Sequence, residues 1–254
     1  MKNHILTRMF LLIAALGVGM ISSCGETSSS STSEHMEQGI EFAGQGELDS
    51  AVAEFLEVIR LDPEHAEAHG RLGYVYSELG RIDDAIEEYE EAIRIDPDNA
   101  HVHNALGNTY SDRNSNDEAI AEFEETLRID PDYAEAHYNL GVIYAAQNRL
   151  DEAVSEYREA IRINPEYAEA YFNLGAAYSK QGLFDEAGIE WEEAIRVNPG
   201  YADAHYNLGI IYAGQGLVDK SINEMETYLS LEPDSPNRAA VEEALVQLRA
   251  HQDN

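Results

Sequence analysis

Six of the seven prolines recur every 34 residues, and this period constrains the fold more than any other feature of the chain. They are Pro63, Pro97, Pro131, Pro165, Pro199 and Pro233. A fixed period of this length is typical of stacked repeats, in which each unit buries its apolar face against the next. With proline as position 32, six repeats begin at residues 32, 66, 100, 134, 168 and 202.

Each repeat carries the pattern of two helices. Positions 4, 7, 8 and 11 have the i, i+3, i+4, i+7 spacing of one helix face, and position 8 is glycine in all six repeats, which lets the second helix approach closely. Glycine or asparagine at position 15 indicates a left-handed turn after the first helix. Aspartate at position 18 predicts an N-cap for the second helix, and proline at position 32 ends that helix.

This pattern resembles the tetratricopeptide repeat family over roughly four-fifths of the chain. The resemblance implies an all-α fold: a right-handed α-solenoid of six helix-turn-helix repeats within residues 34–235. The expected repeats are 32–65, the first and degenerate one, followed by 66–99, 100–133, 134–167, 168–201 and 202–235. Ser235 as an N-cap and Pro236 in the first turn predict a capping helix within residues 236–254.

Residues 1–23 have the organisation of a signal peptide, in which Lys2 and Arg8 precede an apolar run too short to span a bilayer. The stretch ISSC, which ends at Cys24, resembles the lipobox of bacterial lipoproteins. The resemblance implies that Cys24 becomes the first residue and carries diacylglycerol and an N-acyl chain such as palmitate. Residues 24–33 are then a flexible Ser-rich tether.

Gly25 follows the cysteine where aspartate would indicate inner-membrane retention, so the outer membrane is favoured. We therefore expect a protein of the cell envelope that faces the periplasm and contacts the membrane only through its lipid anchor. The alternative is an ordinary secretory signal with an incidental cysteine.

The formal net charge is -33, from 16 basic and 49 acidic residues. Such a surface repels nucleic acid and anionic lipid headgroups, because both require basic groups to displace their counterions. The favoured partner is a protein or peptide, and a basic segment in particular. No nucleic acid partner is expected.

No residue pattern points to catalysis, a metal site or a small-molecule cofactor. Histidine occupies position 4 in several repeats, but equivalent positions lie about one repeat apart, too far to share one metal ion. His65 and His69 are four residues apart, yet His65 is expected to precede the helix. The nucleophile-elbow, zinc-protease and phosphate-loop motifs do not occur. The sequence therefore predicts a protein that is not an enzyme.

The first helices of tetratricopeptide proteins line the concave side, so the resemblance implies that positions 2, 5, 6, 9, 12 and 13 face a groove. Position 6 of the last three repeats is Asn139, Asn173 and Asn207, and position 5 is Tyr138, Phe172 and Tyr206. An amide carries both a donor and an acceptor, so it can hold a peptide backbone of any sequence. These asparagines are similar to the asparagine ladder of some tetratricopeptide proteins that hold extended peptides.

Asn108 of the third repeat is included in this expected peptide site, although the earlier repeats are less regular. Glu135, Glu169 and Asp203 at position 2 would favour a basic segment. The alternative is that asparagine here serves solubility or local hydrogen bonding.

The sequence thus predicts a membrane-anchored scaffold or adaptor that binds a protein or extended peptide in its groove. The rival hypothesis is a structural or oligomerising spacer lipoprotein in envelope assembly, similar to the pilotins, with no peptide-binding role. An enzyme or sugar-binding domain would require a polar pocket that the sequence does not indicate.

Overall fold

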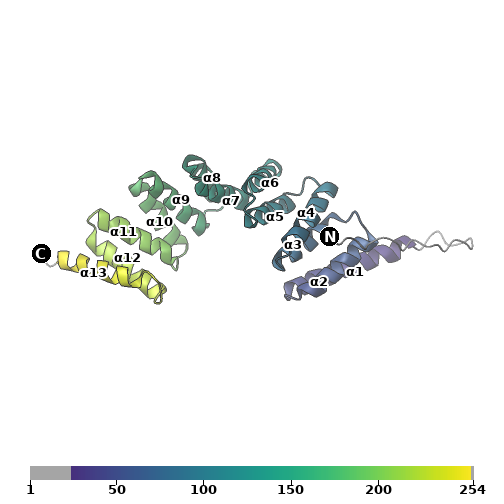
Figure 1. Cartoon of the computed structure of the whole chain (residues 1–254), viewed down its shortest axis with the longest axis horizontal. Helices are drawn as coiled ribbons and strands as arrows, with labels where there is room; N and C mark the ends of the chain where they lie inside the picture. Colours follow the sequence, from purple (N-terminus) through teal and green to yellow (C-terminus); the bar gives the residue numbers. More distant parts are fainter. Residues whose placement is uncertain (1–23, 253–254) are drawn as a thin grey trace, which may run out of the picture. The chain divides into compact units, whose positions relative to one another are not determined.

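The computed structural model describes residues 24–252, with side chains from residue 31 to residue 250. Within this range the chain forms thirteen α-helices joined by short turns, and no strand is present there (Figure 1). The predicted signal peptide, residues 1–23, and the side chain of Cys24 lie outside the described residues. The chain divides at Pro63 into two compact units.

The first unit contains one helix pair, α1 (Cys24–Gly44) and α2 (Leu48–Leu61). α1 begins at Cys24, so residues 24–33 are helical where the sequence predicted a flexible tether. This expectation is corrected for a simple reason. The part of α1 that packs on α2 supplies the helix nucleus, and each further residue then adds a hydrogen bond without a new nucleation cost. Serine lowers helix stability only slightly.

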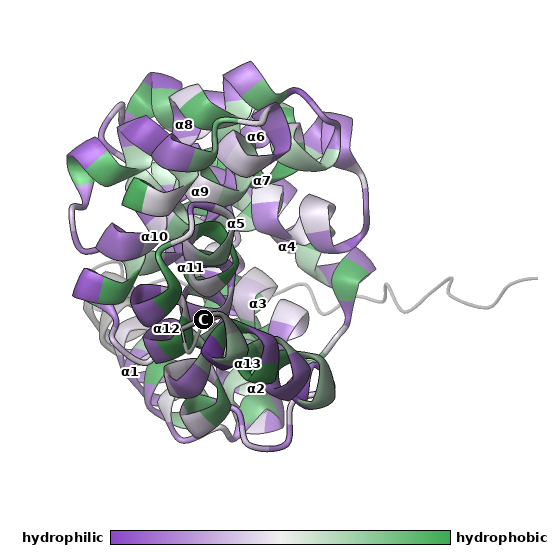
Figure 2. Ribbon diagram, turned by 90° about the vertical axis from the view of Figure 1, so that its left-hand side faces the viewer, coloured by the Kyte–Doolittle hydropathy of each residue, from purple (hydrophilic) through white to green (hydrophobic). Residues whose placement is uncertain are grey.

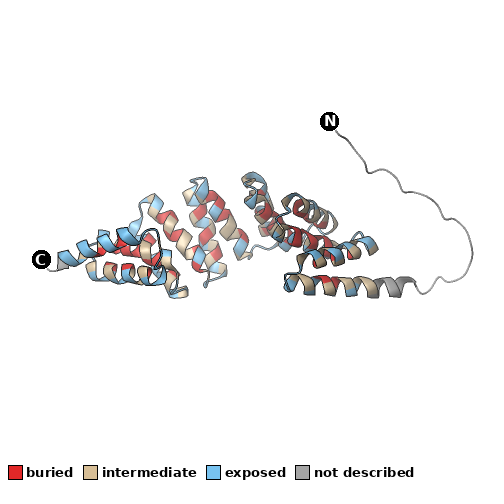
Figure 3. Ribbon diagram, turned by 60° about the horizontal axis from the view of Figure 1, so that its bottom comes forward, coloured by how far each residue is buried: buried red, intermediate tan, exposed pale blue. Residues whose placement is uncertain are grey.

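The second unit contains five helix pairs and a final helix. The pairs are α3 (Ala66–Glu78) with α4 (Ile82–Ile95), α5 (Ala100–Asp112) with α6 (Asn116–Ile129), α7 (Ala134–Ala146) with α8 (Leu150–Ile163), α9 (Ala168–Gln181) with α10 (Phe184–Val197), and α11 (Ala202–Gly214) with α12 (Val218–Leu231). The final helix is α13 (Arg238–Gln252). Hydrophobic and hydrophilic residues alternate around these helices, and the buried residues follow the contacts between paired helices (Figures 2 and 3).

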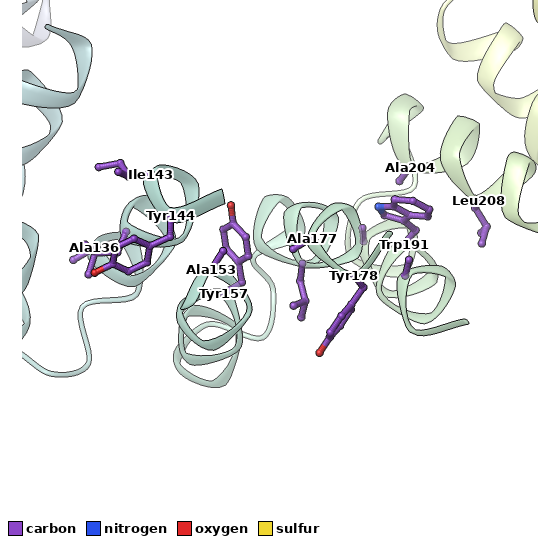
Figure 4. Close-up of a cluster of buried hydrophobic side chains, with 14 of the residues drawn as sticks. Ala136, Ile143, Tyr144, Ala153, Tyr157, Ala177, Tyr178, Trp191, Ala204 and Leu208 are labelled. Carbon is purple, nitrogen blue, oxygen red and sulfur yellow. The ribbon is translucent and has the colours of Figure 1, made fainter. Parts of the chain in front are cut away.

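In the first five pairs an aromatic ring of the second helix lies directly on the backbone of the first, and Met225 takes this place in the sixth pair. A Cβ atom added to Gly141 would lie 2.6 Å from Cε1 of Tyr157, and one added to Gly175 would lie 2.6 Å from Nε1 of Trp191. Both rings are almost fully buried in the core of the second unit (Figure 4). Glycine at position 8 is therefore a packing requirement, as expected.

The turn inside each pair has a left-handed residue at position 15. Asn114 and Asn148 have φ angles of 61° and 60°, and glycine takes the same conformation in the other repeats. The second helix then begins at position 17, so aspartate at position 18 lies in the first helical turn and is not the N-cap that the sequence predicted. The residues at the N-cap make no side-chain capping bond. The left-handed residue at position 15 turns the chain so that the second helix begins at position 17, one residue before the aspartate.

Three of the position-18 aspartates instead connect neighbouring repeats. Asp83 accepts from Arg113 at 2.8 Å, and Asp151 accepts from Gln181 at 2.8 Å. Asp185 accepts from Gln215 at 2.8 Å in the same way. In each case the donor is position 14 of the following repeat. The aspartates therefore combine a favourable place near a helix N-terminus with a polar link to the next repeat.

Histidine at position 4 pairs with glutamate at position 23 of the same repeat. The distances from Nδ1 to the carboxylate are 2.6 Å for His35–Glu54, 2.7 Å for His69–Glu88, 2.7 Å for His103–Glu122, 2.6 Å for His137–Glu156 and 2.5 Å for His205–Glu224. The fifth repeat has Tyr171 in place of histidine, and burial raises the pKa of Glu190, the position-23 residue of that repeat. Histidine here links the two helices of a pair, which the sequence did not predict.

α13 covers the last repeat, as the sequence predicted. Val241 and Leu245 are buried against Met225 and Tyr228. This contact removes the apolar surface that would otherwise remain open at the end of the stack. Within the described residues, no helix combines the length and the hydropathy that a membrane-spanning segment needs.

Candidate peptide-binding face

The predicted site residues lie on the first helices of the second unit, α5, α7, α9 and α11. We call the surface made by positions 2, 5, 6 and 9 of α3, α5, α7, α9 and α11 the first-helix face. α3 contacts α5 and α7 contacts α9 directly, so these positions follow one another from repeat to repeat. The face therefore brings the predicted asparagines and aromatic residues together on one surface.

The amides of the third and fourth repeats are connected to each other. Asn139 donates from Nδ2 to Oδ1 of Asn108 at 2.7 Å, and Asn108 donates from Nδ2 to Oε1 of Glu135 at 3.1 Å. This chain of bonds fixes the orientation of both amides. Asn139 uses only its Nδ2 in this chain of bonds, so its carbonyl oxygen can still accept a hydrogen bond from a ligand.

The next two asparagines have different surroundings. Asn173 donates from Nδ2 to the hydroxyl oxygen of Tyr138 at 3.0 Å. Asn207 is half-buried, and its side chain has no hydrogen bond to the described part of the chain. The three position-6 asparagines are therefore not bonded to one another, and their orientations are set repeat by repeat.

Each position-5 ring packs against another aromatic ring of its own repeat. Tyr138 lies 4.8 Å from Tyr167, measured between ring centroids, and Phe172 stacks on Tyr201 at 4.8 Å. Tyr206 lies 5.1 Å from Tyr228. All three are half-buried and pack against the core, so part of each ring remains accessible to a ligand. The expectation that these rings contact a bound peptide stays a prediction.

Burial raises the pKa of several tyrosines on this face. For Tyr138 the burial is reinforced by the negative charge of Glu169, whereas the bond from Asn173 acts in the opposite direction. Burial and nearby carboxylates raise the pKa of Tyr201 to about 12. These hydroxyls therefore stay protonated at neutral pH and can donate hydrogen bonds.

The face is acidic. The position-2 residues Glu67, Glu135, Glu169 and Asp203 are all exposed. The basic groups on the first helices are Arg71, which is paired with Glu67 at 2.7 Å, and Lys180 at the end of α9. An extended segment with positive charge fits this distribution, because unlike charges across an interface favour association.

The remaining candidates of the sequence have structural partners. His65 caps α3, because its Nδ1 accepts the backbone N–H of Ala68 at 3.2 Å. Among the described residues, no group of three side chains is placed to hold a metal ion. The sequence did not single out an open hollow beside Gly70 on the same face, whose volume is about 440 Å³. The one sequence feature that indicates this hollow is the glycine at position 5 of the second repeat, where the last three repeats have an aromatic residue.

Profiles of known families match almost the whole repeat region. A profile described as TPR repeat matches residues 39–80, 73–112, 107–148, 143–182 and 183–216, and a profile described as tetratricopeptide repeat matches residues 202–235. The chain belongs to the tetratricopeptide repeat family. Its fold is that of a protein-interaction scaffold, in a family whose members are typically not catalytic.

Solved structures of tetratricopeptide proteins are similar to this one. A crystal structure of MamA protein is 28% identical, covers 69% of this chain and 96% of its own, and has a TM-score of 0.61. YrrB, described as a TPR protein with an unusual peptide-binding site, is 24% identical over 74% of this chain and 97% of its own, with a TM-score of 0.62.

PilW, described as a widely conserved type IV pilus biogenesis factor, is 21% identical over 86% of this tetratricopeptide chain and 99% of its own, with a TM-score of 0.69. At this level of identity, the likenesses to YrrB and PilW concern the fold alone. No curated protein matches the chain.

Proposed function

We propose that this protein is an adaptor that holds an extended, basic segment of a partner protein along the first-helix face. The observation that carries the proposal is the row of amides at Asn108, Asn139, Asn173 and Asn207, set beside exposed carboxylates. Each amide can meet a peptide N–H or C=O, which gives affinity without a strict sequence requirement. The carboxylates add charge complementarity and a faster association rate.

The orientation of the amides supports this role. Asn139 is held by Asn108, and Asn173 by Tyr138, so these groups lose little side-chain entropy when a peptide binds. A preorganised polar row of this kind suits an extended backbone, which presents its donors and acceptors at regular intervals along its length.

The test replaces Asn139, Asn173 and Asn207 by alanine. We expect affinity for a set of short lysine-rich peptides to fall roughly tenfold or more, because each amide–backbone bond contributes about 1 kcal/mol. The thermal midpoint should stay close to that of the unchanged protein, since the three side chains are outside the core. Fluorescence anisotropy and a thermal melt give the two readings.

The control replaces Ser155, Asn223 and Ser230, which are exposed on the second helices, by alanine. It should bind the peptides as well as the unchanged protein does. Equal binding by the Asn139, Asn173 and Asn207 variant would refute the proposal and would favour the rival role of a structural or oligomerising spacer in envelope assembly.

We further propose that the adaptor is anchored in the cell envelope, at the outer membrane facing the periplasm, by lipid on Cys24. The support is the ISSC stretch and the apolar run before it. Several acyl chains on one cysteine give stable anchoring, because each buried methylene adds about 0.8 kcal/mol.

Replacing Cys24 by serine tests this anchor. We expect the unchanged protein to enter the detergent phase in a detergent partition of whole cells, and the Cys24→Ser variant to stay in the aqueous phase. Ser23→Ala, which keeps the cysteine, should behave like the unchanged protein. Aqueous partition of the unchanged protein would show that the cysteine is incidental.

A further inference from the structure

The position-5 rings occupy the same place in the fourth and fifth repeats. Tyr138 lies 6.0 Å from Tyr157 of its own repeat and 4.8 Å from Tyr167 at the end of that repeat, measured between ring centroids. Phe172 has an equivalent neighbour in Tyr201. The space between the first helices of successive repeats is therefore shaped to hold an aromatic ring.

The second repeat has glycine at this position. Gly70 stands where Tyr138 and Phe172 stand in later repeats, and Asn99 stands where Tyr167 stands. The result is an open hollow of about 440 Å³, here called the Gly70 pocket, on the first-helix face between α3 and α5. Its apolar wall includes Tyr89, Val102 and Ala105, and its rim includes Arg71, Tyr74 and His101.

Side chains of the protein fill only part of the space that the missing ring leaves at Gly70. Val102 stands at position 3, where the other repeats of the second unit have alanine: Ala68, Ala136, Ala170 and Ala204. A Cβ atom added to Gly70 would lie 3.2 Å from Cγ2 of Val102, so this valine occupies the inner part of the space. The outer part stays open, and Tyr74 beside it is 54% exposed.

The rim of the pocket is already ordered. Nδ1 of His101 lies 3.0 Å from the hydroxyl of Tyr133, and the two rings meet edge to face at 5.5 Å. Arg71 is held by its ion pair with Glu67. A ligand therefore meets fixed walls and does not need to order these side chains first.

We infer that the Gly70 pocket receives an aromatic side chain of the same basic peptide segment, an inference that rests on the proposed function. The repeats themselves show which group fits, because an aromatic ring fills the equivalent place in the fourth and fifth repeats. The exposed carboxylates of the first-helix face favour lysine or arginine on either side of that ring. The pocket thus sets a preference for an aromatic residue among basic ones.

The first experiment fills the Gly70 pocket with the residues that the fourth repeat has at the same positions. The double variant Gly70→Tyr/Val102→Ala restores the ring and the alanine of the fourth repeat, so it should fold with a thermal midpoint at least equal to that of the unchanged protein. The probes are two short lysine-containing peptides that differ only in one residue, phenylalanine or alanine. The unchanged protein should bind the phenylalanine peptide roughly tenfold or more tightly, because a buried ring adds substantial apolar contact.

We expect the double variant to lose this difference and to bind both peptides with similar affinity. Val102→Ala alone enlarges the pocket and should keep or increase the preference for phenylalanine. A double variant that folds and still prefers phenylalanine to the same degree would overturn the inference, and so would an unchanged protein with no preference.

A second measurement does not depend on the amides or on a peptide backbone site. N-acetyl-phenylalanine amide is titrated into the unchanged protein, and methyl groups are followed by NMR. Ring-current shifts are expected at Val102 and Ala105 and should be absent at Val142, which is exposed on the same face of the fourth repeat. Absence of shifts at Val102, or equal shifts at Val142, would contradict the inference.

The two proposals fail in different ways. Loss of peptide binding in the Asn139, Asn173 and Asn207 variant, together with an unchanged preference in the pocket variant, would retain the proposed function and reject the pocket. Peptide binding that survives in the asparagine variant, together with Val102 shifts, would retain the pocket and reject the asparagine row.

Discussion

Replacing Gly141 by alanine is expected to lower the free energy of unfolding by about 2 kcal/mol, although alanine is the better helix former. The new Cβ would lie 2.6 Å from Cε1 and 2.7 Å from Cδ1 of Tyr157. That ring is 1% exposed and packed on all sides, so it cannot move aside without displacing the two helices. Overpacking of this kind outweighs the helix propensity gained. Urea unfolding followed by circular dichroism measures the change.

Gly214→Ala is the matched control. Gly214 ends α11, and a Cβ atom added there would have no neighbour within 4 Å. This variant should be neutral or more stable by a few tenths of a kcal/mol, because alanine restricts the unfolded chain more than glycine does. A Gly141→Ala protein as stable as the unchanged one would show that the ring does not rest on the helix backbone.

Raising the pH from about 6 to about 9 is expected to lower the stability of the protein. Nδ1 of His137 faces Glu156 at 2.6 Å, and its Nε2 faces the carbonyl oxygen of Pro131 at 3.3 Å. Only the doubly protonated imidazolium can donate to both acceptors. Burial alone would lower the pKa of His137, but the bond to Glu156, the charge of Glu156 and the Pro131 carbonyl together raise it.

The raised pKa of His137 determines whether stability increases or decreases with pH. The folded-state pKa of His137 lies above its unfolded value near 6.5, so its contribution to stability is complete below that value. The contribution is lost as the pH rises through the folded-state pKa. His137 can contribute a slope of at most about 1.4 kcal/mol per pH unit.

A double variant, His137→Tyr/Glu156→Gln, removes both titrating groups and takes its tyrosine from the fifth repeat, where Tyr171 stands at this position. Its stability should fall less steeply across the same pH range, as measured by urea unfolding at each pH. Parallel curves for this variant and the unchanged protein would rule out a contribution from the His137–Glu156 pair.

The repeat architecture was predictable because it depends on residues that act within one helix pair. Glycine at position 8 and a ring at position 24 recur together, and the structure brings each such pair into contact. The start of the second helix was less predictable. It depends on the conformation of the turn, so Asp83, Asp151 and Asp185 bind the next repeat and do not cap a helix.

The candidate site was predictable in position but only partly in geometry. The register placed Asn139, Asn173 and Asn207 on the first helices correctly. The position-5 side chains lie at the boundary between the face and the contact with the next repeat, and a helical pattern cannot distinguish these two surroundings. The Gly70 pocket depends on Gly70 and Val102 from different repeats, so neither residue indicates it alone.

The extensive helix contacts of the second unit join helices that are adjacent in the chain, with smaller ones between α3 and α5 and between α7 and α9. Because no repeat depends on a distant one, a gene could gain or lose one 34-residue segment in frame and still encode matching junctions. The number of asparagine-bearing repeats, and with it the length of segment that the proposed site would hold, is therefore open to change by duplication. Such a change would leave the contact between the last repeat and α13 as it is.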